Sequence, residues 1–299
     1  MITSIQRSIG ALVGLAVGDA IGTTVEFMSR GSYPPVTDMV GGGPFNLAPG
    51  QWTDDTSMAL CLAESLLEYG FDIADQMERY LKWRDDGYMS STGKCFDVGI
   101  ATSAAIEHYR LTGNSRAGSK NPTTAGNGSI MRLAPVVIFY QHRPDEALHY
   151  SAEQSVTTHQ APECLQACRL MAEVMLRAFQ GLPKSAVLAS SQQDPTWTKA
   201  MREIAVGTYK SKQEIEIRGT GYVVQSLEAA LWCFHTTESF KDCVLLAANL
   251  GDDADTTAAI AGQIAGAYYS VNSIPQDWLK RLAWGERIST MAEQLALHR

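Results

Sequence analysis

The chain has few cysteines, few charged residues and no long unbroken hydrophobic run. Its 299 residues include six cysteines, and charged residues make up 19% of the total. The only close pair, Cys164 and Cys168, has helical spacing, so we expect buried free thiols rather than a disulfide framework. The apolar stretch over residues 258–271 is interrupted by two glycines and a glutamine. It is also shorter than the ~20 apolar residues of a membrane span, so we expect no membrane insertion.

Other absences narrow the class of protein further. The amino terminus lacks the basic region, apolar run and cleavage site of a secretory signal, so we expect a cytoplasmic location. The formal net charge of −8 argues against nucleic acid as the main ligand. With 45% hydrophobic residues, the composition also excludes disordered and collagen-like chains. An ordinary globular protein remains.

Strand-like alternation of polar and apolar residues is nearly absent, with one short run over residues 213–218. Apolar residues recur at helical spacing instead, first over residues 5–17 and again after Asp55. Further helices are expected over residues 72–85, 97–111, 144–156, 161–180, 195–206, 221–235, 238–250, 254–271 and 276–297. No repeat and no long polar linker divides the chain. We therefore predict a single all-α domain over residues 1–299.

Two acidic clusters stand where helices are expected to begin. Residues 53–56 read Thr-Asp-Asp-Thr, and residues 252–256 read Asp-Asp-Ala-Asp-Thr. Taken alone, Thr53 or Asp54 is explained as a helix N-cap. Five carboxylates exceed what two caps need, however, and their repulsion costs free energy unless cations neutralise it. Oxygen ligands suit Mg²⁺ or Mn²⁺, with Ca²⁺ as an alternative, and do not suit zinc. Together the clusters predict a metal centre.

Four further features have two interpretations each. The Gly-Asn-Gly-Ser turn at residues 126–129 suits either an anion site or a tight loop. Asp97, beside apolar residues, suits proton transfer or an N-cap. His159 precedes an expected helix and is either structural or part of a site. Tyr222 follows a glycine-rich turn and suits either the core or stacking on a planar ligand.

Four motifs, in this order and spacing, resemble a known family. They are Gly-Leu-Ala-Val-Gly-Asp-Ala-Ile-Gly at residues 14–22 with Glu26 and Phe27, Trp-Thr-Asp-Asp-Thr at 52–56, Gly-Asn-Gly at 126–128, and Asp-Ala-Asp-Thr at 253–256. They resemble the ADP-ribosylglycohydrolase family, in particular its bacterial dinitrogenase reductase-activating type. The resemblance extends from about residue 8 to residue 288, nearly the whole chain.

The resemblance implies an all-α, orthogonal multi-helix domain whose cleft holds a binuclear Mg²⁺ or Mn²⁺ centre. The implied activity is hydrolysis of the N-glycosidic bond between ADP-ribose and an arginine side chain of a modified protein, with ADP-ribose as product. By position, the metal ligands are Thr53, Asp54, Asp55, Asp253, Asp255 and Thr256. The implied catalytic residues are Asp97, Asp55 and Asp253. The implied substrate-binding residues are Glu26, Gly126, Asn127, Gly128, Ser129, His159 and Tyr222.

Three departures from the family pattern leave the target open. The family commonly has glycine where this chain has Asp252, a second histidine where it has Ala161, and glycine where it has Ser270. No implied metal ligand is lost. The alternatives are a non-catalytic ADP-ribose-binding or structural relative, a hydrolase of serine-linked or small-molecule ADP-ribose, and an immunity protein acting against an ADP-ribosylating toxin.

Overall fold

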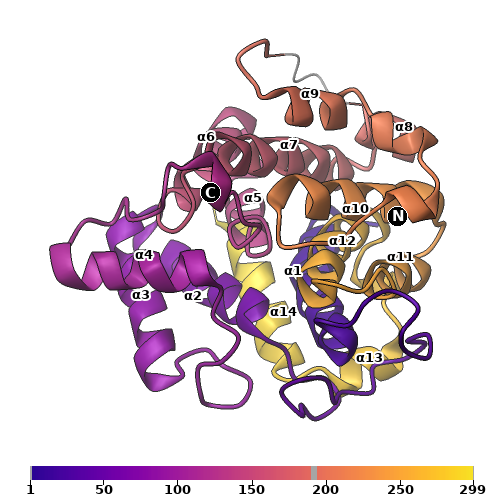
Figure 1. The fold of residues 1–299 in the computed structure, drawn as a ribbon, viewed down its shortest axis with the longest axis horizontal. Coiled ribbons are helices and arrows are strands. Elements are labelled where there is room, and N and C mark those ends of the chain that lie inside the picture. Colours follow the sequence, from indigo (N-terminus) through magenta and orange to yellow (C-terminus); the bar gives the residue numbers. More distant parts are fainter. Residues whose placement is uncertain (1, 190–193, 299) are drawn as a thin grey trace.

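The computed structural model describes residues 2–189 and 194–298, and helices dominate throughout this part of the chain (Figure 1). The α-helices are α1 (Ser4–Gly22), α2 (Asp54–Tyr69), α3 (Ile73–Asp86), α4 (Ile100–Thr112), α5 (Ala134–Phe139), α6 (Pro144–Ser155), α7 (Pro162–Phe179), α8 (Lys184–Val187), α9 (Lys199–Ala205), α10 (Val223–Thr236), α11 (Phe240–Ala248), α12 (Ala254–Tyr269), α13 (Gln276–Arg281) and α14 (Gly285–Leu297). Within the described ranges the β-structure amounts to isolated bridges. The all-α prediction is confirmed.

Local sequence signals account for several helix ends. Helix α1 begins with a capping box, in which the Thr3 hydroxyl accepts from the Gln6 N–H and the Gln6 side chain accepts from the Thr3 N–H. Asp72 caps α3 by accepting two backbone N–H groups. Gly87 ends α3 in the left-handed conformation, with φ of +69°. The start of α1 and both ends of α3 are therefore explained by local sequence.

Helices α1 and α12 lie against each other at the centre of the molecule (Figure 1). Every fourth residue of α1 from Gly10 to Gly22 is glycine, and each faces a glycine or alanine of α12. A Cβ atom at Gly18 would lie 2.1 Å from the carbonyl oxygen of Ala258. The two backbones are thus in direct contact, and the end of α1 lies beside the start of α12.

This central helix also has the length and composition of a membrane span. Residues Ser4–Val25, with a mean hydropathy of 1.5, and not residues 258–271, are the stretch in the described chain that is long and apolar enough to span a membrane. Yet 89% of the apolar window is buried inside the protein, as in a core helix. Its hydrophobicity is explained by packing against α12 and its neighbours.

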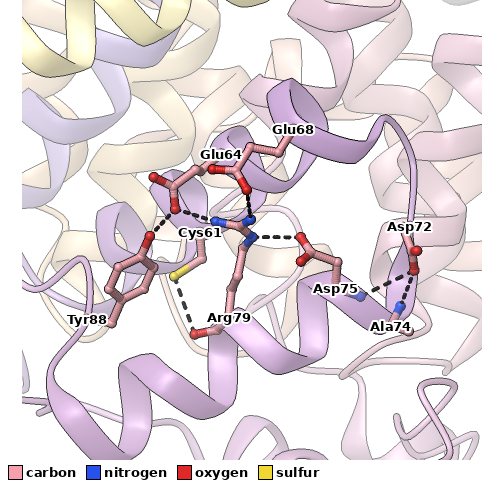
Figure 2. A network of polar contacts seen from close by, with 8 residues as sticks. All are labelled: Cys61, Glu64, Glu68, Asp72, Ala74, Asp75, Arg79 and Tyr88. Atoms are coloured by element: carbon pink, nitrogen blue, oxygen red, sulfur yellow. Dashed lines mark hydrogen bonds and ion pairs between the residues drawn. The ribbon is translucent and has the colours of Figure 1, made fainter.

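A buried arginine joins α3 to α2 (Figure 2). Arg79 donates to Asp75 (2.6 Å) on its own helix and to Glu68 (2.7 Å) and Glu64 on α2. The hydroxyl of Tyr88, just after α3, also donates to Glu64. Three carboxylates around one guanidinium fix α3 and the following loop to the far half of α2. The acidic start of α2 takes no part in this network.

Some predicted helix boundaries are wrong for identifiable reasons. The helix expected over residues 97–111 begins only at Ile100, because Asp97 has φ of +59° and Gly99 is the N-cap residue. The helix expected over residues 276–297 is broken at Trp284, where φ is +57°. The helix expected over residues 195–206 is limited to Lys199–Ala205. The alternating run at 213–218 holds a 3₁₀ turn over Glu214–Glu216.

Helix α5 was not predicted at all. All six of its residues, Ala134–Phe139, are buried, so they show no polar face and no helical period. The cysteines are as expected: all six are free, and all but the half-buried Cys95 are buried.

Candidate functional site

The first acidic cluster is positioned by a carboxylate from another helix. Asp19, fully buried on α1, accepts the backbone N–H groups of Thr53 (2.8 Å) and Thr56 (3.0 Å). It also accepts the hydroxyls of Thr53 (2.9 Å) and Thr56 (2.6 Å). Thr53 is the N-cap residue of α2 but makes no capping hydrogen bond with its own side chain. The N-cap interpretation of Thr53 or Asp54 is therefore wrong, because Asp19 does the capping.

The second acidic cluster is fixed by a loop pairing. Asp252 has φ of +57°, its N–H donates to the carbonyl of Met28 (2.8 Å) and its carbonyl accepts from the N–H of Phe27 (2.8 Å). These bonds hold the start of α12 against the segment that carries Glu26. Asp253 is the N-cap residue of α12 but caps nothing, and its Oδ2 accepts from Nδ2 of Asn127 (2.7 Å).

The two clusters, far apart in sequence, meet at the bottom of a cavity. Oγ1 of Thr53 lies 3.2 Å from Oδ2 of Asp55 and 3.3 Å from Oδ2 of Asp255. Oγ1 of Thr256 lies 3.5 Å from the same oxygen of Asp55. The other oxygens, Oδ1 of Asp55 and of Asp255, are buried without a hydrogen-bond partner in the described structure. Buried anionic oxygens without donors are what a bound cation would satisfy, so this oxygen-rich set fits Mg²⁺ or Mn²⁺.

Two further carboxylates, those of Glu26 and Asp97, complete the acidic region. Glu26, Asp97 and Asp255 each place an oxygen within 4.8 Å of the others. Oxygens of Asp19, Asp55 and Asp255 are equally close to one another. Both oxygens of Asp19 already accept two hydrogen bonds each, so we assign Asp19 to holding α2 rather than to a metal. This role of Asp19 was not predicted; the signal in the sequence is an aspartate inside an otherwise apolar helix.

Burial and crowding raise the pKa values of these acids. Burial, with the charges of Asp97 and Asp253, raises the pKa of Glu26 to about 9. The pKa of Asp97 is raised to about 6, mainly by burial and secondly by the charges of Asp19 and Asp253. For Asp54, Asp55 and Asp255 the pKa is raised well above its ordinary value, again mainly by burial. A bound cation would reduce the free-energy cost of ionising these buried acids.

The cavity above the acids has a volume of about 820 Å³. The predicted site residues that line it are Glu26, Asp54, Asp97, Gly126, Asn127, Gly128, His159, Asp253, Asp255 and Thr256. Thr53 and Asp55 lie just behind this lining, in contact with the acids described above. Ser129 is fully buried away from the cavity and accepts from Sγ of Cys168. Tyr222 lines an adjoining cavity of about 1030 Å³, where its hydroxyl donates to Glu163 (2.6 Å).

The turn at residues 126–129 forms one wall of the first cavity. The N–H of Asn127 donates to the carbonyl of Gly221 (3.1 Å), which ties the turn to the segment before α10. The N–H groups of Gly128 and Ser129 have no hydrogen-bond partner among the described residues. No helix follows directly, since α5 begins at Ala134. The unpaired N–H of Gly128, which lines the cavity, makes this turn suitable for an anionic oxygen.

The raised pKa values predict how the stability of the metal-free protein depends on pH. Glu26 keeps its proton up to about pH 9 when folded, whereas its ordinary pKa is 4.5. Between these values the unfolded chain binds fewer protons, so the free energy of unfolding falls as pH rises. From pH 7 to 8, one such group lowers it by about 1 kcal/mol, which for a chain of this length corresponds to a Tm decrease of about 2 °C.

Calorimetry in chelator at several pH values from 7 to 8 checks this expectation. Buried His159, whose pKa is lowered to about 3, is neutral when folded and mostly neutral when unfolded in this range, so it adds only a small opposite effect. Saturating Mg²⁺ should flatten the dependence, because the cation replaces the protons. A Tm that stays constant or rises with pH in chelator would contradict the prediction.

Comparisons with known proteins show the family of the chain. The sequence profile of the ADP-ribosylglycohydrolase family matches residues 2–299. The chain is 46% identical to the ADP-ribosylarginine hydrolase Tri1 of Pseudomonas putida, over 98% of this chain and 78% of the relative. It is 34% identical to the ADP-ribosyl-[dinitrogen reductase] glycohydrolase of Rhodospirillum rubrum, over 93% of this chain and 90% of the relative.

A solved structure has the same fold. It is described as an ADP-ribosylglycohydrolase-related protein complex, and it superposes with a TM-score of 0.89 at 43% identity, covering 99% of this chain and 98% of the other. Family profile, relatives and fold agree over nearly the whole chain. The chain belongs to the ADP-ribosylglycohydrolase family.

Proposed function

We propose that this protein hydrolyses the N-glycosidic bond between ADP-ribose and the arginine side chain of a modified protein. The observation that carries the proposal is the pair of unpartnered carboxylate oxygens, on Asp55 and Asp255, at the base of a cavity of about 820 Å³. A cavity of this size suits a small-molecule group such as ADP-ribose. Identity of 46% and 47% with two relatives named ADP-ribosylarginine hydrolase supports arginine as the linkage.

Six residues supply the oxygens for the proposed binuclear Mg²⁺ or Mn²⁺ centre. They are Thr53, Asp54, Asp55, Asp253, Asp255 and Thr256. When bound, the ions supply positive charge that orients the ribose hydroxyls and makes a water molecule a stronger nucleophile at neutral pH. The protein contributes a preformed, largely buried set of ligands on the starts of two helices, α2 and α12.

The chain's own groups account for the rest of the proposed chemistry. Cleavage builds positive charge on the ribose ring, and the carboxylates of Asp54 and Asp253 stabilise it electrostatically. The unpaired N–H group of Gly128, which lines the cavity, is suited to a diphosphate oxygen. Asp97, whose pKa is raised to about 6 by burial and nearby acids, is suited to protonate the departing guanidine directly or through a relay.

Replacing Asp97 with asparagine tests the proton-transfer role. The amide keeps the size of the side chain but cannot deliver a proton, so we expect kcat to fall by about 10²-fold or more. Metal affinity, measured by calorimetric titration with Mn²⁺, should stay close to that of the wild type. Wild-type turnover in Asp97→Asn would remove Asp97 from the mechanism. Loss of Mn²⁺ binding would instead make it a metal ligand.

The proposed function is tested by release of free ADP-ribose. An arginine-linked and a serine-linked ADP-ribosylated protein are each incubated with Mg²⁺, with Mn²⁺ and with chelator. Metal-dependent release from the arginine-linked substrate alone supports the proposal. Release from the serine-linked substrate would show that the protein cleaves the O-linked bond to serine. Binding of ADP-ribose without release from either would make the protein a non-catalytic binding relative.

A further inference from the structure

Arg132, which follows the turn at residues 126–129, is fully buried and held by neutral groups. Its Nε donates to Oε1 of Gln154 (3.0 Å) and its Nη1 to the carbonyl oxygen of Gly128 (3.1 Å). Its Nη2 donates to Oγ1 of Thr157 (2.9 Å) and Oγ1 of Thr158 (2.8 Å). No carboxylate is among its partners in the described part of the chain. Burying a cation without an opposite charge costs free energy. The groups that this guanidinium holds in place are therefore candidates for a functional role.

The hydroxyl of Thr158 links this guanidinium to a histidine ring. Arg132 can only donate hydrogen bonds, so Oγ1 of Thr158 accepts from it and keeps its own proton for another acceptor. The only other partner of that hydroxyl in the described structure is Nδ1 of His159, at 2.8 Å. If Nδ1 carried a proton, the buried hydroxyl would be left without an acceptor, a cost that folded proteins avoid. The hydroxyl therefore donates to Nδ1, and the ring proton is on Nε2.

The Nε2 edge of His159 faces the cavity between two glycines. A Cβ atom at Gly126 would lie 3.1 Å from Nε2, and one at Gly128 would lie 2.7 Å from Cε1. Both glycines and the histidine line the cavity of about 820 Å³. Nε2 has no hydrogen-bond partner among the described residues, so its proton is available to a bound molecule. The glycines leave room for the ring to approach the turn this closely.

We infer that Arg132 is a positioning residue which, through Thr158, fixes His159 as an Nε2–H donor pointing into the cavity. The identity of the acceptor rests on the proposed function: a diphosphate or ribose oxygen of ADP-ribose. His159 then acts as a neutral, fixed donor and not as an acid or base. The lowered pKa of His159, to about 3 through burial and the charge of Arg132, agrees with this role. Because Arg132 also holds the Gly128 carbonyl, it aligns the turn and the ring together.

The position of the ring proton is the direct test. ¹⁵N spectra of histidine-labelled full-length protein show whether Nδ1 or Nε2 is protonated, and the His159→Gln variant identifies the His159 signals. The wild type should show the proton on Nε2. In Thr158→Val the fixed tautomer should be lost, and the Kd for ADP-ribose should rise about tenfold, the usual effect of one hydrogen bond. Thr158→Ser, which restores the hydroxyl, should return both to wild-type values.

Thr157→Val is the matched control. It also removes an acceptor of Arg132, but the Thr157 hydroxyl makes no hydrogen bond to His159 in the described structure. We expect it to keep the Nε2–H tautomer. A proton on Nδ1 in the wild type, or the same loss of tautomer in Thr157→Val as in Thr158→Val, would overturn the inference. The spectrum is recorded without substrate, so failure to bind or cleave ADP-ribose would refute the proposed function while leaving the tautomer result intact.

Discussion

Asp255→Asn is expected to lose hydrolysis by at least ~10³-fold and to lose the binding of divalent metal at the same time. Asp255 lies between both groups of acids, within 4.8 Å of Asp55 on one side and of Glu26 and Asp97 on the other. One of its oxygens has no partner in the described structure. Asp55→Ala and Asp253→Ala should behave in the same way. An active, metal-loaded Asp255→Asn variant would contradict a metal centre at this position.

The same variant should be more stable than the wild type when metal is absent. Replacing this acid with an amide removes the burial cost and the repulsion from Glu26 and Asp55 that raise the pKa of Asp255 itself. In chelator we therefore expect a higher Tm for Asp255→Asn than for the wild type. Adding Mg²⁺ should raise the Tm of the wild type and leave that of the variant unchanged. Thermal scans with and without Mg²⁺ measure both effects.

The Asp19→Ala variant tests whether Asp19 positions the start of α2 or binds metal. Asp19 accepts four hydrogen bonds from Thr53 and Thr56, so its loss leaves the start of α2 without a cap. We expect a lower Tm both in chelator and in Mg²⁺, the opposite sign in chelator to that of Asp255→Asn. Equal behaviour of the two variants would mean that Asp19 also binds metal.

Gly18→Ala is expected to destabilise the fold by about 3 kcal/mol or more, because a single methyl group meets backbone on the facing helix. Its Cβ would lie 2.1 Å from the carbonyl oxygen and 2.5 Å from the carbonyl carbon of Ala258. Neither atom belongs to a flexible side chain, so α1 and α12 must separate. Separation would also shift Asp19 and Asp255, and activity should fall together with stability.

Gly99→Ala is the control for this effect. A Cβ atom at Gly99 would have its nearest neighbour at 3.9 Å, on the Thr102 side chain, and Gly99 has an ordinary negative φ of −58°. Its free energy of unfolding, from urea titration, should stay within about 0.5 kcal/mol of the wild type. A similarly small loss in Gly18→Ala would show that the helix contact adapts easily.

The sequence predicted most of the helices because their apolar stripes have a clear period, and the acidic clusters because they repeat at two helix starts. It could not predict α5, since Ala134–Phe139 is buried on every side. The sequence pattern placed Asp97 in a helix, because no neighbouring residue indicates its positive φ. Asp19 was overlooked because its partners, Thr53 and Thr56, are distant in the chain. Tertiary contacts decide each of these cases.

The contact between α1 and α12 has a consequence for how the protein is made. Thr53 and Asp255, which meet in the acidic region, are 202 residues apart, so the ribosome needs on the order of 10–40 s between them at ~5–20 residues per second. During that interval the apolar α1 has no α12 to cover its glycine face. The nascent chain is then most exposed to aggregation, and the acidic region can form only after α12 has emerged. Assembly of the site therefore comes late during synthesis, although its first residues are made early.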